Sequence, residues 1–373
     1  MEMKRIVLTG GPCAGKTTAL SWITNYFSKN GWKVIVVNEA ATELITSGMS
    51  PVDFTSPLTF QKLLMGTQLD KEDAVEVYAP CLKDKDKVLV VCDRGICDNR
   101  AYQSKEDFEK VLNYFGINMT KAFDRYDAVF HMVTAADGAE EFYTLQNNIA
   151  RSEGVKEAIE LDRRTQNAWV GHPHLRIIKN KGTFEDKLKN LMSEISNFLG
   201  EPEPYEIERK FLIRYPDTEL LMTMPNCEKV EILQTYLVSE PNVEVRVRQR
   251  GSNGSYSFTK TEKRYTDEPS KRVDIEKRIS KDEYLKLLMH ADPDLHPVRK
   301  TRYCIMQRES GQYLEIDAYA GETEYAILEV ELPNAESQAV IPGYLTVIKE
   351  VTENPVYRNV NIASVGHLPH PDK

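Results

Sequence analysis

The chain has 373 residues, of which 41% are hydrophobic and 28% are charged. A chain of this length and apolar content can bury more than one core, which predicts two domains rather than one. The formal net charge of -9 argues against broad non-specific binding to duplex DNA or to an anionic membrane, although a local basic cavity is compatible with it.

The five apolar runs of the first half are separated by longer segments, which predicts a parallel sheet with helices on both faces, the α/β class. These runs are 6–8, 34–37, 88–91, 128–130 and 175–178. Residues 184–199 have apolar side chains at helical spacing, and Thr183 with Asp186 forms a capping box at their start. The polar, proline-containing stretch 200–204 then predicts a linker between domains 1–200 and 201–373.

The second half changes to a hydrophobic period of two, which predicts an antiparallel sheet or barrel. The clearest alternating segments are 206–213, 243–250, 272–279, 313–319 and 326–332. Residues 280–290 are the one clear helix predicted for this half.

The cysteine pattern and the N-terminus indicate a cytoplasmic protein. The six cysteines form no C-x-x-C pair, and the N-terminal residues lack the charged-then-apolar pattern of a secretion signal. No uncharged apolar run approaches the roughly 20 residues of a membrane-spanning helix. We therefore expect a soluble protein without a transmembrane segment.

A phosphate-binding loop follows the first predicted strand. The segment 10–17 reads GGPCAGKT and matches G-x-x-x-x-G-K-[ST], before a stretch with helical spacing. Its backbone N–H groups and the helix N-terminus would bind phosphates, Lys16 would reach the β and γ oxygens, and Thr17 would ligate magnesium. The predicted nucleotide-binding residues are Gly10, Gly11, Gly15, Lys16, Thr17, Thr18 and Arg151.

Acidic residues follow two further strands of this half. Asp93 ends the run 88–92, where a carboxylate can hold the magnesium shell or accept a proton from an acceptor hydroxyl. The alternative is that Asp93 caps the next helix. Glu39 follows another strand and is either near an acceptor hydroxyl or a solvated acid. Arg151, Arg163 and Arg164 would belong to a lid that closes over the phosphates.

The phosphate loop, Asp93-Arg94-Gly95, Asp98, Tyr102 and the run from Asp162 to His174 together resemble a known family. It is the P-loop kinase-like domain shared by nicotinamide riboside kinases and the TRPL translocation defect protein, and the resemblance covers residues 4 to 199. It implies binding of ATP or GTP with magnesium and a kinase or NTPase domain, while the acceptor-binding residues of riboside kinases have no clear match.

Charged residues two positions apart recur on the strands of the second half, so that each pair or triplet shares one face. On any single strand this indicates an ordinary solvated face. Repetition across strands favours a polar tunnel that holds water, Mg²⁺ or Mn²⁺ and a polyanion, because desolvated charges need compensation. The sets are Glu206, Glu208 and Lys210; Arg246, Arg248 and Arg250; Lys300 and Arg302; Glu315 and Asp317; and Glu329 and Glu331.

These strings resemble the CYTH, or triphosphate tunnel metalloenzyme, family from about residue 205 to 364, although Asp274 stands where family members often have Glu. The resemblance implies a closed antiparallel barrel of roughly eight strands. It implies metal ligands at Glu206, Glu208, Glu329 and Glu331, with Glu315 and Asp317 near a second ion. The implied phosphate-binding residues are Lys210, Arg246, Arg248, Arg250, Lys260, Lys300 and Arg302.

The sequence thus predicts a metal-dependent triphosphatase joined to a nucleotide-binding domain. Inorganic tripolyphosphate or a nucleoside triphosphate would be hydrolysed by metal-activated water. A second hypothesis is a nucleotide-regulated module that binds phosphoinositide or polyphosphate without turnover, and a third is an adenylate cyclase. The paired carboxylates favour catalysis, because a phosphate binder needs only cations. The residues expected to be catalytic are Asp93, Glu206, Glu208, Lys210 and Arg248.

Overall fold

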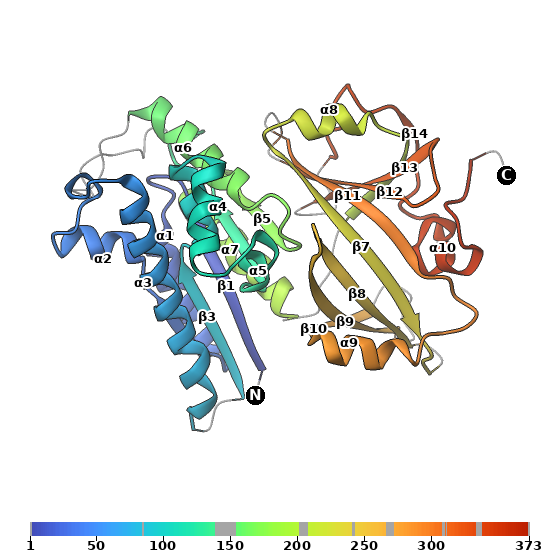
Figure 1. Ribbon diagram of the computed structural model, residues 1–373, viewed down its shortest axis with the longest axis horizontal. Coiled ribbons are helices and arrows are strands. Elements are labelled where there is room, and N and C mark those ends of the chain that lie inside the picture. The colour runs from blue at the N-terminus through green and yellow to red at the C-terminus, as the bar shows by residue number, and fades with distance from the viewer. Residues whose placement is uncertain are drawn as a thin grey trace. The chain divides into compact units, whose positions relative to one another are not determined.

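The computed structural model describes residues 2–83, 86–138, 154–200, 208–240, 243–265, 272–307, 310, 312–332 and 338–371. The chain divides into two compact units, residues 1–195 and 196–373. Figure 1 shows the helices and strands of both. In the described ranges, no helix combines the length and the apolarity needed to cross a bilayer.

The first unit contains a five-stranded parallel sheet in the order β2-β3-β1-β4-β5. The apolar runs of the sequence form its interior, since Ile6, Val7 and Leu8 of the central strand are fully buried. The predicted parallel α/β sheet is confirmed. Its strands are β1 Glu2–Gly10, β2 Lys33–Val37, β3 Lys87–Asp93, β4 Ala128–Met132 and β5 Leu175–Ile178.

Helices flank this sheet, and the longest ones have buried apolar stripes. The last helix spans the predicted range, and Thr183 and Asp186 form the predicted capping box, with Thr183 N donating to Asp186 Oδ2 at 2.8 Å. The helices are α1 Lys16–Lys29, α2 Ala40–Thr46, α3 Pro57–Tyr78, α4 Lys105–Tyr114, α5 Met119–Asp124, α6 Val155–Ala168 and α7 Phe184–Leu199, with the short helices η1 Pro51–Asp53, η2 Ala79–Cys81 and η3 Ile96–Tyr102.

The turn after β3 is tightly enclosed. Trp169 and Tyr126 are fully buried and pack edge to face, with ring centroids 5.4 Å apart. A Cβ placed on Gly95 would lie 2.8 Å from the Trp169 ring and 2.9 Å from the Tyr126 ring. Only glycine therefore fits between β3 and η3 at this position.

The second unit contains a nine-stranded sheet in the order β10-β9-β8-β7-β11-β12-β13-β6-β14. All its strand pairs are antiparallel, and Figure 1 shows the sheet strongly curved. Its strands are β6 Glu208–Arg214, β7 Cys227–Leu237, β8 Val243–Ser252, β9 Ser255–Tyr265, β10 Arg272–Arg278, β11 Val298–Met306, β12 Tyr313–Tyr319, β13 Tyr325–Glu331 and β14 Val347–Glu350.

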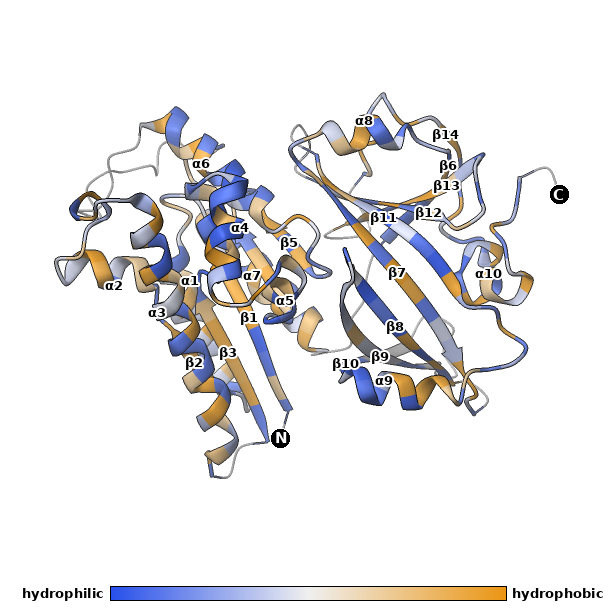
Figure 2. Ribbon diagram, viewed as in Figure 1, coloured by the Kyte–Doolittle hydropathy of each residue, from blue (hydrophilic) through white to orange (hydrophobic). Residues whose placement is uncertain are grey.

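The cross-strand register sorts the residues of this sheet onto two faces, because directly paired residues point to the same side. Helices α8 (Thr218–Thr223) and α9 (Lys281–Leu288) pack on the outer, apolar face through Leu221 and Tyr284. The inner face is charged on most strands. Figure 2 shows hydrophilic residues interleaved with hydrophobic ones along β7. At one end it is apolar, and η5 (Pro355–Tyr357) and α10 (Asn359–Val365) pack there.

The antiparallel sheet and the helix at 280–290 were predicted, but the sequence analysis missed two helices of this unit. Helices α8 and α10 have six and seven residues, too short for a clear hydrophobic period. No strand pairing joins β10 to β14 within the ranges given above, so closure into a barrel stays a prediction.

We expect Gly95→Ala to destabilise the first unit by about 1–3 kcal/mol, because the added methyl group overpacks the space beside Trp169 and Tyr126. Chemical denaturation followed by far-ultraviolet circular dichroism, which reports on both units, measures this. Gly343→Ala is the control, since nothing lies within 4 Å of its added Cβ, and it should change stability by less than about 0.5 kcal/mol. Equal stability of the two variants would contradict the packing described.

Candidate functional sites

The phosphate loop of the first unit lies between β1 and α1, the position expected from its motif. Gly15 has a left-handed φ of 88° and precedes the first turn of α1. A Cβ at Gly15 would lie 2.4 Å from the Phe184 ring, which excludes other residues. Lys16, Thr17 and Thr18 begin the helix, whose free N–H groups suit an anion.

Two buried carboxylates hold the neighbouring backbone. Asp162 of α6 accepts hydrogen bonds from Gly11 N at 2.7 Å and Thr134 N at 3.1 Å. Asp98 of η3 accepts hydrogen bonds from Thr9 Oγ1 and from Gly95 N, the latter at 2.8 Å. Helix α6 is thereby bonded directly to the phosphate loop.

Lys187 of α7 also supports this loop, and the sequence analysis did not single it out. Its Nζ donates to Ala14 O at 3.1 Å, to Val133 O at 2.6 Å and to Asn180 Oδ1 at 2.8 Å. Burial lowers the pKa of Lys187 to about 8. In the sequence, Lys187 is one polar residue on a helix predicted to be amphipathic, and nothing in that pattern indicates that it supports the loop.

Asp93, Arg94 and Glu39 lie together with Lys16 at the carboxyl ends of β2 and β3. Arg94 Nε donates to Glu39 Oε1 at 2.6 Å. Burial would raise the pKa of Glu39, but Arg94 and Lys16 outweigh it and lower the pKa to about 2. Burial raises the pKa of Asp93 and lowers that of Lys16. Asp93 Oδ1 and Arg94 Nη1 are buried without a hydrogen-bond partner, which suits a polar ligand.

Two of the arginines predicted to form a lid are not buried among these residues. Arg163 and Arg164 are exposed on α6, and Arg151 lies outside the described residues. Glu39, by contrast, is an ion-paired acid rather than a solvated one. Asp98, rather than Asp93, forms the capping interaction of η3.

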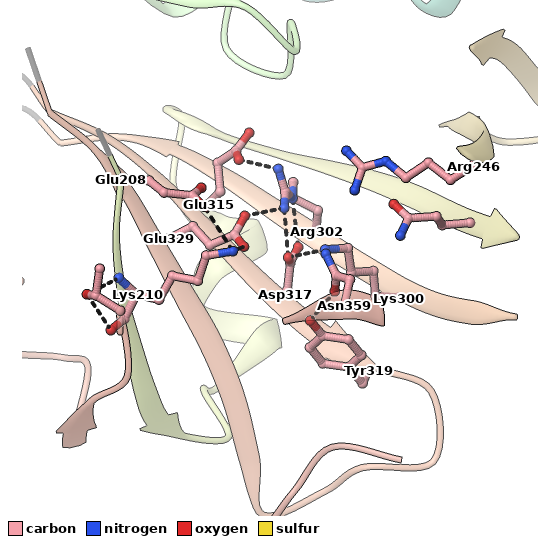
Figure 3. Close-up of polar contacts among 12 residues, drawn as sticks. Glu208, Lys210, Arg246, Lys300, Arg302, Glu315, Asp317, Tyr319, Glu329 and Asn359 are labelled. Carbon is pink, nitrogen blue, oxygen red and sulfur yellow. Dashed lines mark hydrogen bonds and ion pairs between the residues drawn. The ribbon is translucent and has the colours of Figure 1, made fainter. Parts of the chain in front are cut away.

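The inner face of the second unit has an ion-pair cluster centred on Arg302. Its Nε and Nη2 donate to Asp317 Oδ1 and Oδ2, both at 2.7 Å. Nη2 also donates to Glu329 Oε2 at 2.6 Å, and Nη1 donates to Glu315. Lys300, only 4% exposed, donates to Asp317 as well. Figure 3 shows Arg302 among these three carboxylates.

Lys210 extends the cluster onto β6. Its Nζ lies 3.0 Å from Glu208 Oε1 and 2.8 Å from Glu329 Oε1. Burial alone would lower the pKa of Lys210, but Glu329 and Glu208 outweigh burial and raise it. Burial likewise favours the neutral form of Glu329, yet Lys210 and Arg302 hold its pKa well below the ordinary range. Both groups are therefore charged at neutral pH.

Strand β8 carries the inner-face cations Arg246, Arg248 and Arg250, and Arg246 Nη1 lies 3.9 Å from Glu244 Oε1. The pKa of Arg248 is lowered to about 10, mainly because the side chain is buried and also because Arg246 lies nearby. The Nε atoms of Arg246 and Arg248, Gln234 Oε1 and Thr259 Oγ1 are buried without hydrogen-bond partners. Gln234, Arg248 and Thr259 are cross-strand neighbours. Two of these four atoms are guanidinium donors, so an anion suits this surface.

The register corrects one predicted phosphate-binding residue. Lys260 is paired with Val247, which is fully buried in the outer core with Leu237 and Tyr284. Lys260 therefore points away from Arg246 and Arg248, because adjacent residues of a strand alternate between faces. Thr259 and Gln234, which the sequence analysis missed, lie on the inner face. Uncharged side chains gave no charge pattern that could have identified them.

The predicted metal ligands are only partly described. Glu206, together with the side chains of Asp274 and Glu331, lies outside the described residues. In the part that is described, no three acidic, histidine or cysteine side chains are arranged to hold a metal ion. The chemistry of the donors nevertheless suits a hard cation, since Glu208, Glu315 and Glu329 present carboxylate oxygens on one face.

Comparison with known proteins gives one family match. Residues 5–187 match the family described as an AAA domain. No curated protein matches the chain.

Solved structures that resemble the chain include two crystal structures of NE1496, one titled as an inorganic triphosphatase and the other as a hypothetical protein. Both are 28% identical to this chain. The triphosphatase structure has a TM-score of 0.31, and the match spans 43% of this chain and 95% of that one. The other has a TM-score of 0.32, and the match spans 44% of this chain and 100% of that one. The PH1819 protein from Pyrococcus horikoshii OT3 is 24% identical, with a TM-score of 0.26, covering 35% of this chain and 80% of its own. TM-scores this low establish neither fold nor activity.

The Arg94–Glu39 pair predicts a pH-dependent contribution to stability. The pKa of Glu39 is lowered on folding, so the contribution is fully present above about pH 4.5 and is lost as the pH falls toward 2. Relative to Glu39→Gln, the wild-type free energy of unfolding should fall by roughly 2 kcal/mol between pH 4.5 and 3. Urea denaturation at each pH measures the difference. A difference that stays constant would show that Glu39 has an ordinary pKa.

Proposed function

We propose that the inner face of the second unit binds a triphosphate with Mg²⁺ or Mn²⁺ and hydrolyses it, and that the phosphate loop separately binds ATP or GTP. The observation that carries the first part is the pair of buried, unpartnered guanidinium Nε atoms of Arg246 and Arg248. A cationic surface opposite an acidic cluster suits an anion and a metal together.

Charge supports a polyphosphate rather than a single phosphate. Arg246, Arg248 and Arg250 recur at every second position of β8 and share the inner face. Such cations repel one another unless anionic groups lie between them. A linear triphosphate places negative oxygens at several points along its length, as this row requires. We propose that the curved sheet closes around it as a barrel.

Hydrolysis would transfer the terminal phosphoryl group to water. Water attacks the terminal phosphorus, the bridging P–O bond breaks, and pyrophosphate and orthophosphate leave with one proton released to solvent. A divalent cation, when bound, would polarise the phosphate oxygens and lower the pKa of the attacking water. Arg248 and its neighbours on β8 would stabilise the charge that develops on the departing pyrophosphate.

The acids distinguish this proposal from the alternative of binding without turnover. Glu208, Glu315 and Glu329 lie on the same inner face of the sheet as the cations. Their negative charge would weaken simple capture of an anion, and they suit a metal. A phosphoinositide- or polyphosphate-binding module would gain nothing from them. Cyclase activity would convert ATP into a cyclic nucleotide and pyrophosphate without releasing orthophosphate, so the products distinguish it from hydrolysis.

The first unit supports nucleotide binding through its P-loop and its match to the AAA domain. The kinase-like role that its resemblance to riboside kinases implies is part of the proposal. Asp93 is the better proton acceptor, because burial raises its pKa while Glu39 is held ionised by Arg94. Thr17 would hold the magnesium ion of the nucleotide, and Asp93 would join it there as the alternative to its role as proton acceptor.

Arg248→Met tests the second unit. Removing one cation that stabilises the transition state should lower kcat for tripolyphosphate on the order of a hundredfold. Arg299→Met is the matched control, since Arg299 is exposed on the outer face of β11, and it should retain full activity. Phosphate release with Mg²⁺ or Mn²⁺ measures both. Metal-independent turnover, or equal activity of the two variants, would refute the proposal.

Lys16→Ala separates the two sites. It should abolish binding of ATP and GTP, because Lys16 supplies the cation of the phosphate loop, and it should leave tripolyphosphate hydrolysis unchanged. Calorimetry for the nucleotides and phosphate release for the hydrolysis measure the two effects. Loss of both activities in a folded variant would mean that one site serves both.

A further inference from the structure

Arg302 is bonded to three carboxylates, although a phosphate-binding arginine would keep its N–H groups for the phosphate. It donates four hydrogen bonds, and they reach Asp317, Glu315 and Glu329. Glu315 and Glu329 are direct cross-strand partners, so their like charges repel unless a cation lies between them. The guanidinium of Arg302 supplies that cation, at the oxygens where a metal ion would bind.

The three acids have different roles in this arrangement. Asp317 is fully buried and accepts from Lys300 as well as from Nε and Nη2 of Arg302. Those donors use both carboxylate oxygens, so Asp317 anchors the arginine. Glu315 and Glu329, by contrast, each contact only the outer nitrogens of Arg302. Asp317 is therefore better placed as a positioning residue than as the metal ligand that the sequence suggested.

Charge balance links the metal to the anion. Among the described residues of the cluster, Glu208, Glu315, Asp317 and Glu329 oppose Lys210, Lys300 and Arg302, which leaves one negative charge (three cations minus four acids). A divalent cation alone would reverse that charge and leave Arg302 desolvated without two of its partners. A triphosphate would give the released guanidinium a new partner. Arg302 is close enough to Arg248 to contribute, after burial and Arg246, to lowering the pKa of Arg248.

We infer that Arg302 occupies the metal position until substrate arrives, and that it exchanges Glu315 and Glu329 for phosphate oxygens as the divalent cation binds them. This inference rests on the proposed function of the same face. It requires that metal and triphosphate bind cooperatively, because each removes the charge imbalance that the other creates. Asp317 keeps its bonds throughout and holds Arg302 within reach of both partners.

The test measures Mn²⁺ binding to the full chain carrying Lys16→Ala, with and without a nitrogen-bridged tripolyphosphate analogue that resists hydrolysis. The analogue should tighten Mn²⁺ binding roughly tenfold or more. Arg302→Met should tighten binding of Mn²⁺ alone by a similar factor, since the competitor is gone, and should remove most of the enhancement by the analogue. Arg302→Lys keeps the positive charge but lacks the planar guanidinium that bonds several carboxylates at once, so its gain in Mn²⁺ affinity should be intermediate.

Lys300→Met is the matched control. It removes the same charge beside Asp317 but leaves Arg302 between Glu315 and Glu329, so Mn²⁺ affinity should rise far less than in Arg302→Met. Equal tightening by Lys300→Met and Arg302→Met would overturn the exchange, because charge alone would explain it. Unchanged Mn²⁺ affinity in both Arg302 variants would overturn it too. Failure of the parent protein to bind the analogue at all would instead contradict the proposed function.

Discussion

The meeting of Glu315 and Glu329 on adjacent strands is the constraint on which the second unit depends. Like charges placed directly opposite destabilise a sheet, and these two are nearly buried. Arg302 and Lys210 resolve the conflict, and Asp317 fixes Arg302 in turn. One part of the inner face is therefore balanced internally, whereas on β8 the buried Nε atoms of Arg246 and Arg248 have no hydrogen-bond partner. This asymmetry suits the proposed arrangement, with the metal near the acidic cluster and the anion along β8.

The first unit uses buried carboxylates differently. Asp162 and Asp98 accept backbone hydrogen bonds, so they shape the phosphate loop and the turn after β3. Lys187 donates hydrogen bonds to two backbone carbonyl oxygens at the same loop, those of Ala14 and Val133. A phosphate loop must present its N–H groups in a fixed arrangement, and these three side chains supply the rigidity. Asp93 is left with an unpartnered oxygen near Lys16, where a ligand would be placed.

Sequence patterns gave the elements and the charged faces because both depend on local periodicity. The five parallel strands, the capped helix α7 and the inner positions of Arg246, Arg248 and Arg250 follow from periods of 2 and 3.6. Lys260 was misplaced because its face depends on pairing with Val247, a register that no local pattern fixes. The ion pairs between acids and bases could not be predicted either. The alternation placed Arg302 and Glu315 on inner faces, but only the strand order brings β11, β12 and β13 together.

A crystal structure of the full chain with Mn²⁺ and a non-hydrolysable tripolyphosphate analogue tests the proposed site most directly. We expect the analogue along β8, with phosphate oxygens bonded to Arg246 and Arg248, and an anomalous manganese peak beside Glu315 and Glu329. Arg302 should then contact phosphate while Asp317 retains its bond to Nε. An analogue bound only at the phosphate loop, with Arg302 still joined to all three acids, would contradict the proposal.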